Sequence, residues 1–434
     1  MTTQDRNMPR EVERKSFNLK LVGILMQTKL FWGLAALYLV GVLSSPLTSA
    51  GRNIFVSYGN TTDVLRQVSV TGIVAIGMTL VILIAGIDLS VGSLLALGSV
   101  TCAMLLTKGG WTAATYFGIP AAGLVVLLSS LFAMNFIGKA AGLIGKRNDN
   151  ASARSTDVAI RSVLMLAAAG TALLAMMWAA AQVDTKFGVL AVLLVVPCIG
   201  AVIGALNGTL IVVGKLQPFI VTLAMMVGVL GLARVIAGQD TAVYPVYTGT
   251  NATINFENLR ILLWGIIPVP VLFFLGALIV FQFVTRMTTF GGYLRAIGGN
   301  EEASRLAGIN VGRIKIITYA ISGYLAALAS VLYVAQFRQG KPDAGVGLEL
   351  DAIAAVVIGG TSLMGGKGSV IGTLVGVLIF GFLGNILQLN NIDSNTQLIL
   401  KGVIIILAVL VQEGQLRSFF ARLTFIGGLG KRRT

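Results

Sequence analysis

The stretch VSVTGIVAIGMTLVILIAGIDLSVGSLLALGSVTCAMLLT, residues 68–107, holds a single charged side chain, Asp88. A membrane-spanning helix needs about 20 apolar residues, because the hydrocarbon core of a bilayer is roughly 30 Å thick. The stretch is long enough for two such helices, and Gly86-Ile87-Asp88 interrupts it between them. Because the apolar runs are continuous rather than alternating, they predict helices and not strands.

The same pattern extends over the whole chain. Of its 434 residues, 56% are hydrophobic and 11% are charged, and the mean hydropathy is +0.88. A soluble domain usually carries about 25% charged residues. We therefore predict an all-α, polytopic membrane protein with about 10–12 transmembrane helices, some of them broken or half-helices. The predicted spans are 30–48, 67–86, 91–107, 118–137, 160–182, 187–213, 218–237, 261–285, 314–336, 350–362, 370–388 and 398–412.

The basic residues predict the orientation in the membrane. The net charge is +15, and the cations gather in the N-terminal tail, the linker 138–161, the loop 286–313 and the C-terminal tail. Cytoplasmic loops carry such an excess of Lys and Arg, so both termini are expected in the cytoplasm. Because these cations sit between apolar runs, we expect a lipid bilayer as the surrounding partner and no nucleic acid. The predicted divisions are a tail at 1–29, a transmembrane domain at 30–413 and a basic tail at 414–434.

Several chemistries are disfavoured by the residue types. The chain has no histidine, and its two cysteines, Cys102 and Cys198, lie inside apolar runs without metal-ligand spacing. We therefore expect no catalytic residue, no metal site and no cofactor on this chain. The sequence GGTSLMGGKGS at 359–369 is not a phosphate-binding loop, since Thr361 stands where the first glycine of that motif should be. If the process is driven by ATP, a separate subunit must bind the nucleotide.

Two glycine-broken apolar segments predict the interior of the fold. Asp88 and Ser90 lie in the first, and the second, residues 359–368, follows Glu349 and Asp351. A carboxylate at membrane depth is expensive, so Asp88 is expected either to cap the helix that follows it or to line a solute path. The glycines of the second segment allow either close helix packing or a cavity lined by main chain.

The loop GGNEEASRLAGIN at 298–310 predicts a short helix. Asn300 suits its N-cap, Glu301 and Glu302 suit its first turn, and Gly308 suits its end. Glu301 and Arg305 are four residues apart and can pair. Such a helix either serves only the local structure of the loop or is a rigid knob that docks into a groove of a cytoplasmic partner. The residues assigned to this coupling role are Asn300, Glu301, Glu302, Arg305, Leu306, Gly308 and Asn310.

Polar residues within the spans complete the set of candidates. Asn207 and Asn385 are better explained as hydrogen-bonding links between helices, and Phe219 as packing, although a sugar ring could stack on it. Pro218 predicts a helix start. The candidate residues of a solute path are Asp88, Ser90, Asn207, Phe219, Thr222, Glu349, Asp351, Thr361, Ser362 and Asn385.

Four segments together resemble the permeases of bacterial monosaccharide importers of the ATP-binding-cassette class, the ribose, xylose and galactose branch. They are GIDLSVGS at 86–93, GALNG at 204–208 with PFIVTL at 218–223, IGGNEEASRLAGIN at 297–310, and ELDAIAAVVIGGTSLMGGKGSVIGTL at 349–374. The resemblance implies two permease copies, or a permease pair, in the bacterial cytoplasmic membrane. It also implies two cytoplasmic ATPase subunits that hold ATP and Mg, and an extracytoplasmic sugar-binding protein. The loop at 298–310 would be the family's coupling helix.

Residues 108–190 depart from this pattern, because family members pass between the matching segments with far less chain. An extra apolar pair brackets the basic linker there. Two other classes of protein were weighed. An ion-coupled secondary transporter should carry several intramembrane carboxylates, and a membrane enzyme should carry clustered titratable groups. The sequence offers mainly Asp88, with Glu349 and Asp351 near an interface, and does not indicate which sugar is carried.

Overall fold

The computed structural model describes residues 31–107, 170, 188–238 and 242–412. Three predicted segments lie outside the described residues: the tail at 1–29, the helix pair at 118–137 and 160–182 except for residue 170, and the basic tail at 414–434. Within the described part the fold is helical, as predicted. Six helices are long and apolar enough to cross a membrane. The number of crossings in the whole chain stays a prediction.

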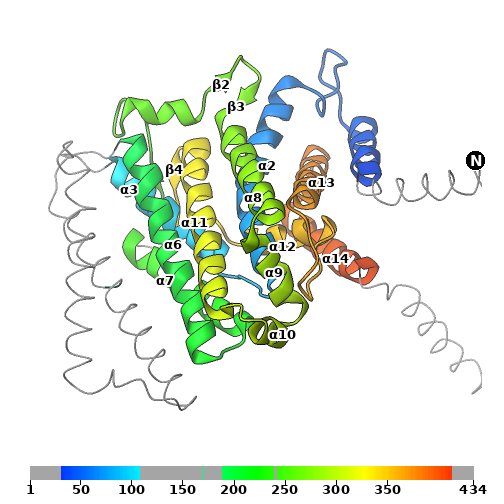
Figure 1. The fold of residues 1–434 in the computed structure, drawn as a ribbon. Helices are drawn as coiled ribbons and strands as arrows, with labels where there is room; N and C mark the ends of the chain where they lie inside the picture. The colour runs from blue at the N-terminus through cyan, green and yellow to red at the C-terminus, as the bar shows by residue number, and fades with distance from the viewer. Residues whose placement is uncertain (1–30, 108–169, 171–187, 239–241, 413–434) are drawn as a thin grey trace, which may run out of the picture.

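The helices follow one another in the order expected from the apolar runs (Figure 1). The six long ones are α2 (Tyr58–Leu83), α6 (Val189–Gly214), α7 (Pro218–Ala237), α8 (Val269–Met287), α11 (Val311–Phe337) and α13 (Val370–Leu389). The others are Phe31–Ser44, α3 (Val91–Thr107), α9 (Thr289–Gly299), α10 (Glu301–Leu306), α12 (Leu348–Ile358) and α14 (Ser394–Gln412). Pro218 is the first residue of α7, which confirms the predicted start.

The predicted span 261–285 is wrong at its beginning. Residues 262–268 form a small hairpin of β2 (Leu262–Leu263) and β3 (Ile267–Pro268), and α8 begins only at Val269. Trp264 and Gly265 adopt left-handed backbone at its tip, with φ of 49° and 70°. Pro268 and Pro270 delay the helix, because proline lacks the N–H that a continuing helix would need. Apolar composition alone therefore merged a hairpin with a span.

The described end opposite α10 carries the remaining short elements (Figure 1). Strand β1 (Tyr244–Pro245) pairs antiparallel with β4 (Gln339–Gly340), and η1 (Ile254–Leu259) lies between β1 and β2 along the chain. Glu257 of η1 accepts hydrogen bonds from Thr248, Arg260 and Arg338. Burial raises the pKa of Glu257, but these bonds and the two arginine charges outweigh it, so the pKa lies below its usual value. The ionised carboxylate ties η1 to the end of α11.

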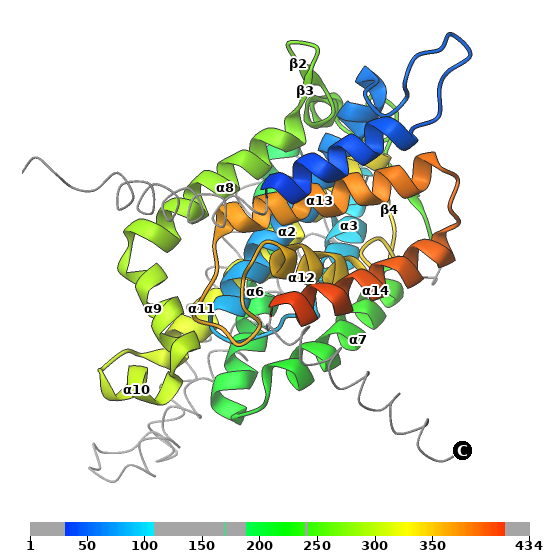
Figure 2. The ribbon, with the colours of Figure 1, turned by 90° about the vertical axis from the view of Figure 1, so that its right-hand side faces the viewer.

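The centre of the fold is α2 with α3 and α11 around it. In α2, 78% of the most apolar 18-residue stretch is buried, against 17% in α8. Helix α8 therefore presents most of its apolar surface outward. A helix with an exposed apolar surface suits contact with lipid rather than water. Figure 2 shows α12 near the middle of the molecule, with α13 and α14 beside it. The predicted span 350–362 is a half-helix of 11 residues, too short to cross the bilayer.

Glycines let α6 and α11 approach closely. Gly200, Gly204 and Gly208 lie on one face of α6, and a Cβ on any of them would meet the α11 backbone. For Gly204 the obstructing atoms belong to Tyr319, and for Gly208 to Ile316. Small residues four apart permit such contacts between membrane helices, where packing rather than water drives association.

Replacing Gly204 by alanine should therefore destabilise the protein. The added Cβ meets backbone, which cannot rotate away, so we expect a loss of about 1–3 kcal/mol in the free energy of unfolding. The measurement is thermal unfolding of the purified chain in detergent. Gly228→Ala is the matched control, because Gly228 has open space around its Cβ position. Equal stability of the two variants would contradict the close-packing account.

Candidate functional site

The α2–α3 linker is an unwound stretch in the interior of the fold. Helix α2 ends at Leu83, Ala85 adopts left-handed backbone with φ of 57°, and α3 begins at Val91. Asp88 and Ser90 have no exposed surface. Non-helical backbone at membrane depth is tolerated only where protein or a cavity satisfies its polar groups. The linker therefore needs partners from the surrounding helices.

Asp88 accepts most of these hydrogen bonds. Its Oδ1 accepts from the Ser90 amide at 3.0 Å and from the Ser90 hydroxyl at 2.6 Å, and its Oδ2 accepts from the Ser322 hydroxyl of α11 at 2.8 Å. Asn207 of α6 donates to the Ser90 Oγ at 2.8 Å. Thr222 of α7 donates to the Ile87 carbonyl at 3.1 Å. The carboxylate thus joins the linker to α11 and, through Ser90, to α6, and Thr222 adds a separate bond from α7.

The second glycine-broken segment contacts the first. Helix α12 ends at Ile358 and α13 begins at Val370. Between them the Gly366 amide donates to the Leu83 carbonyl at 3.0 Å, and a Cβ on Gly365 would collide with Ala85. Gly360, Gly365 and Gly366 all have positive φ, between 73° and 88°. The two segments that the sequence singled out separately therefore meet in space.

Helix α9 ends where the two glycine-broken segments meet. A Cβ on Gly298 would meet both the Leu83 carbonyl and the Gly366 amide, whereas Gly299 has open space. The chain then turns directly into α10. Asn300 caps α10 by accepting from the Ala303 amide at 2.9 Å, and Gly308 follows its end with φ of 85°. The predicted short helix and both of its caps are confirmed, and it stands next to the broken segments.

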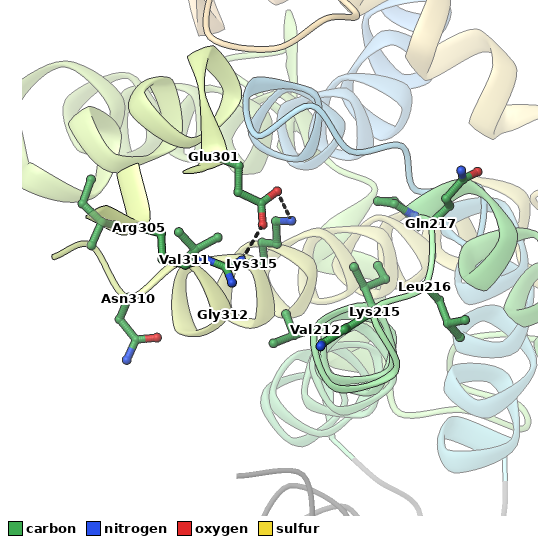
Figure 3. A pocket seen from close by; sticks show the side chains of 13 residues that line it. Val212, Lys215, Leu216, Gln217, Glu301, Arg305, Asn310, Val311, Gly312 and Lys315 are labelled. Carbon is green, nitrogen blue, oxygen red and sulfur yellow. Dashed lines mark hydrogen bonds and ion pairs between the residues drawn. The ribbon is translucent and has the colours of Figure 1, made fainter. Parts of the chain in front are cut away.

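Helix α10 combines an anchored side with an exposed side. Glu301 pairs with Lys315 of α11 at 2.6 Å and with Arg305 at 3.4 Å (Figure 3). Glu302 and Arg305 are exposed, and Leu306 is 82% exposed. Asn310 caps α11 by accepting from the Arg313 amide at 3.1 Å. Leu306, Glu302 and Arg305 therefore leave one side of α10 open to contact with another molecule.

The remaining polar candidates bind elsewhere. Asp351, in the first turn of α12, pairs with Lys401 of α14 at 2.8 Å. Glu349 accepts from the Gly347 amide at 3.2 Å. Asn385 and Asn60 exchange two side-chain hydrogen bonds, of 2.6 and 3.0 Å, between α13 and α2. In the described part of the chain no cluster of three or more Cys, Asp or Glu residues could hold a metal ion.

Comparisons with known proteins place the chain in a family of permeases. Residues 60–141 and 152–409 match the family described as "Branched-chain amino acid transport system / permease component". The chain belongs to this permease family. With its membrane-spanning helices and its bacterial permease relatives, it is a multi-pass protein of the bacterial inner membrane.

Three relatives resemble the permease over most of its length. It is 36% identical to the ribose import permease protein RbsC of Escherichia coli (strain K12), over 86% of this chain and 91% of that protein. It is 31% identical to the xylose transport system permease protein XylH of Haemophilus influenzae, over 85% and 93%. For the galactofuranose transporter permease protein YtfT of Escherichia coli (strain K12) the identity is 30%, over 82% and 80%. No solved structure matches the chain.

Within the permease, the structure brings together only some of the predicted path residues. Asp88, Ser90 and Asn207 share one buried hydrogen-bond network, and Thr222 donates to the neighbouring Ile87 carbonyl. Thr361 and Ser362 lie in the second broken segment, and Phe219 is half exposed on α7. Glu349, Asp351 and Asn385 make the separate contacts described above. The role of each residue on a solute path stays a prediction.

Sequence reasoning missed the side of α11 that serves this site. Lys315 binds Glu301, Tyr319 donates to the Ile87 carbonyl at 3.5 Å, and Ser322 binds Asp88. Spacings of four and three residues place the three on one helix face. Polar residues at that spacing inside an apolar helix were the available signal.

Asp88→Asn and Asp88→Ala should differ in stability. Asparagine keeps one acceptor and offers an amide to Ser322, so we expect a loss of about 1 kcal/mol or less. Alanine leaves the donors of Ser90 and Ser322 without a partner, at about 1–3 kcal/mol for each buried group. Unfolding in detergent measures both variants, with the exposed Asp63→Ala as control.

Solute uptake by the Asp88→Asn variant separates the two interpretations of this carboxylate. Retained uptake is expected if Asp88 serves the fold. Uptake that fails in a variant of unchanged stability would place the carboxylate on the solute path.

Proposed function

We propose that this permease is the membrane-spanning subunit of an ATP-driven importer that carries a monosaccharide, a pentose or a hexose, into the cytoplasm. The family description names branched-chain amino acids, but the three long relatives are named for ribose, xylose and galactofuranose. Identity spread over at least 82% of this chain favours the sugar class. On this proposal the chain catalyses no reaction itself, and ATP and Mg are held by a partner ATPase.

The observation that carries the proposal is the construction of α10. A helix of six residues is too short to be stable alone, yet α10 is capped at both ends, tied to α11 and placed against the broken segments. Its outer side presents Glu302, Arg305 and Leu306. A short helix held so firmly suits a knob that fits a groove of a cytoplasmic ATPase.

The contacts behind α10 offer a route for the force of ATP hydrolysis. Lys315, Tyr319 and Ser322 lie on one face of α11 and connect Glu301 of α10 to the linker around Asp88. Gly298 connects the end of α9 to both broken segments. A displacement of α10 would therefore change contacts at the interior breaks without passing through flexible loops. Coupling of this kind needs an element with two arrangements, and the unwound segments are the candidates.

The solute would cross along the interface of two permease copies, delivered by an extracytoplasmic sugar-binding protein. Asp88, Ser90, Asn207 and Thr222 are held in hydrogen bonds between helices in this conformation. A permease without a tight site of its own can still work, because the binding protein supplies affinity. An ion-coupled transporter would need accessible intramembrane carboxylates, whereas Asp88 is enclosed and Asp351 is paired with Lys401.

Leu306→Asp and the triple variant Glu301→Ala, Glu302→Ala, Arg305→Ala should lose the ATPase while still inserting into the membrane. The altered residues lie outside the apolar spans, so the membrane fraction should contain normal amounts of chain. Affinity purification from the native cells, followed by an ATPase assay, measures the partner. Ile254→Asp, exposed in η1 at the end opposite α10, is the control. Full ATPase recovery with Leu306→Asp would remove the docking role of α10.

Reversing the charge of Glu301 or Lys315 should impair ATP-driven uptake, and reversing both should restore it. Each single change, Glu301→Lys or Lys315→Glu, places like charges at a contact of 2.6 Å. A double-mutant cycle on uptake rates should give a coupling of about 0.5–3 kcal/mol. Glu301→Lys with Arg305→Glu is the control pair, since its contact is longer and more exposed. Equal recovery by both pairs would deny Lys315 a special part.

A further inference from the structure

A cavity opens beside α10, where two membrane helices end (Figure 3). Its volume is about 720 Å³, and its walls come from the α6–α7 turn on one side and from α10 and the start of α11 on the other. Lys215 ends α6 in left-handed backbone, and Pro218 begins α7. A turn between two spans lies at the surface of the bilayer, so the cavity stands at the level of the lipid headgroups.

The cavity carries an excess of positive charge. Lys215, Arg305 and Lys315 line it, together with one carboxylate, Glu301. That carboxylate already binds Lys315 at 2.6 Å and Arg305 at 3.4 Å. Lys215 makes no ion pair with any residue that the structure describes, and Figure 3 shows it across the cavity from Glu301 and Lys315. Three cations against one anion leave a place for a negatively charged ligand.

Apart from Gln217 and Asn310, the rest of the lining is apolar or glycine. Val212, Leu216 and Ile309 contribute to the walls. Next to them on α7, Phe219 and Ile220 are exposed, as expected of side chains that meet lipid. A small soluble anion would gain nothing from these side chains. A molecule with a phosphate and hydrocarbon chains would use both parts of the surface.

We propose that this cavity, formed by the Lys215 turn and α10–α11, binds the headgroup of an anionic phospholipid from the cytoplasmic leaflet. The phosphate lies between Lys215 and the pair Arg305 and Lys315, and an acyl chain lies along Leu216 and Phe219. Basic pockets between membrane helices on the cytoplasmic side recognise such headgroups. The bound lipid would bridge α10 to the α6–α7 turn and so influence the stiffness of the coupling element. The placement rests on the proposed cytoplasmic position of α10.

Native mass spectrometry of the full, delipidated chain tests the proposal. The chain is titrated with phosphatidylglycerol and with phosphatidylcholine of the same acyl chains. We expect preferential binding of phosphatidylglycerol, and about fivefold weaker binding by Lys215→Gln, the effect of one basic residue near an anionic surface. Val212→Trp should also weaken binding, because it fills the cavity while keeping every charge.

Arg286→Gln is the matched control, because Arg286 is an exposed cation in the last turn of α8, outside the cavity. Its binding of phosphatidylglycerol should equal that of the unaltered chain. Equal binding of the two lipids, equal weakening by Arg286→Gln, or undiminished binding by Val212→Trp would overturn the proposal. Displacement of the lipid by equimolar glycerol 1-phosphate would also overturn it, in favour of a soluble anion. The readout needs no ATP or sugar, so it can fail while uptake and ATPase capture succeed.

Discussion

Every backbone polar group inside a bilayer must find its partner within the protein. In this permease that requirement is hardest to meet at the two interior helix breaks, where the backbone is unwound. Helices satisfy themselves, but the stretches 84–90 and 359–369 do not. The fold answers with Asp88, which accepts three hydrogen bonds, and with the Gly366 amide, which donates to Leu83. These contacts also help to hold the surrounding helices in place, since α6, α7 and α11 each contribute a partner to the first break.

The same contacts restrict how the protein can move. Hydrogen bonds are stronger where water is excluded, and breaking them leaves buried polar groups without a partner, so opening the Asp88 network would be expensive. Backbone at Gly298 is in van der Waals contact with both breaks and offers no compressible side chain. A push on α10 is therefore more easily accommodated by moving α9, α10 and the two breaks together than by deforming one of them. This unit, with the unwound segments in it, is then the element with two arrangements that coupling requires, and its contacts with the surrounding helices are what we expect to change.

The sequence was informative wherever a signal is local. Continuous apolar runs predicted α2, α3, α6, α7 and α13, Pro218 predicted the start of α7, and Asn300 with Gly308 predicted the limits of α10. The hairpin at 262–268 was missed because its apolar residues read as part of the next span, and only the left-handed backbone at its tip separates them. The partners of Asp88 and Glu301 were missed as well, because the polar spacing on α11 marks one face of that helix but not the residues that it contacts. Ser322 lies 234 positions beyond Asp88, and Lys315 looked like an ordinary cation at the edge of a span.

Lys315 also lines two neighbouring cavities. The cavity beside α10 and a smaller one, of about 250 Å³, share Pro218, Glu301 and Lys315 in their walls. The smaller cavity reaches Gly86 and Tyr319, and Tyr319 in turn hydrogen-bonds the linker beside Asp88. The Glu301–Lys315 pair therefore lies between the cavity beside α10 and the buried network around Asp88. One ion pair thus links α10 to α11 and forms part of the wall of both cavities, so a movement of α10 that separates the pair would change the shape of both.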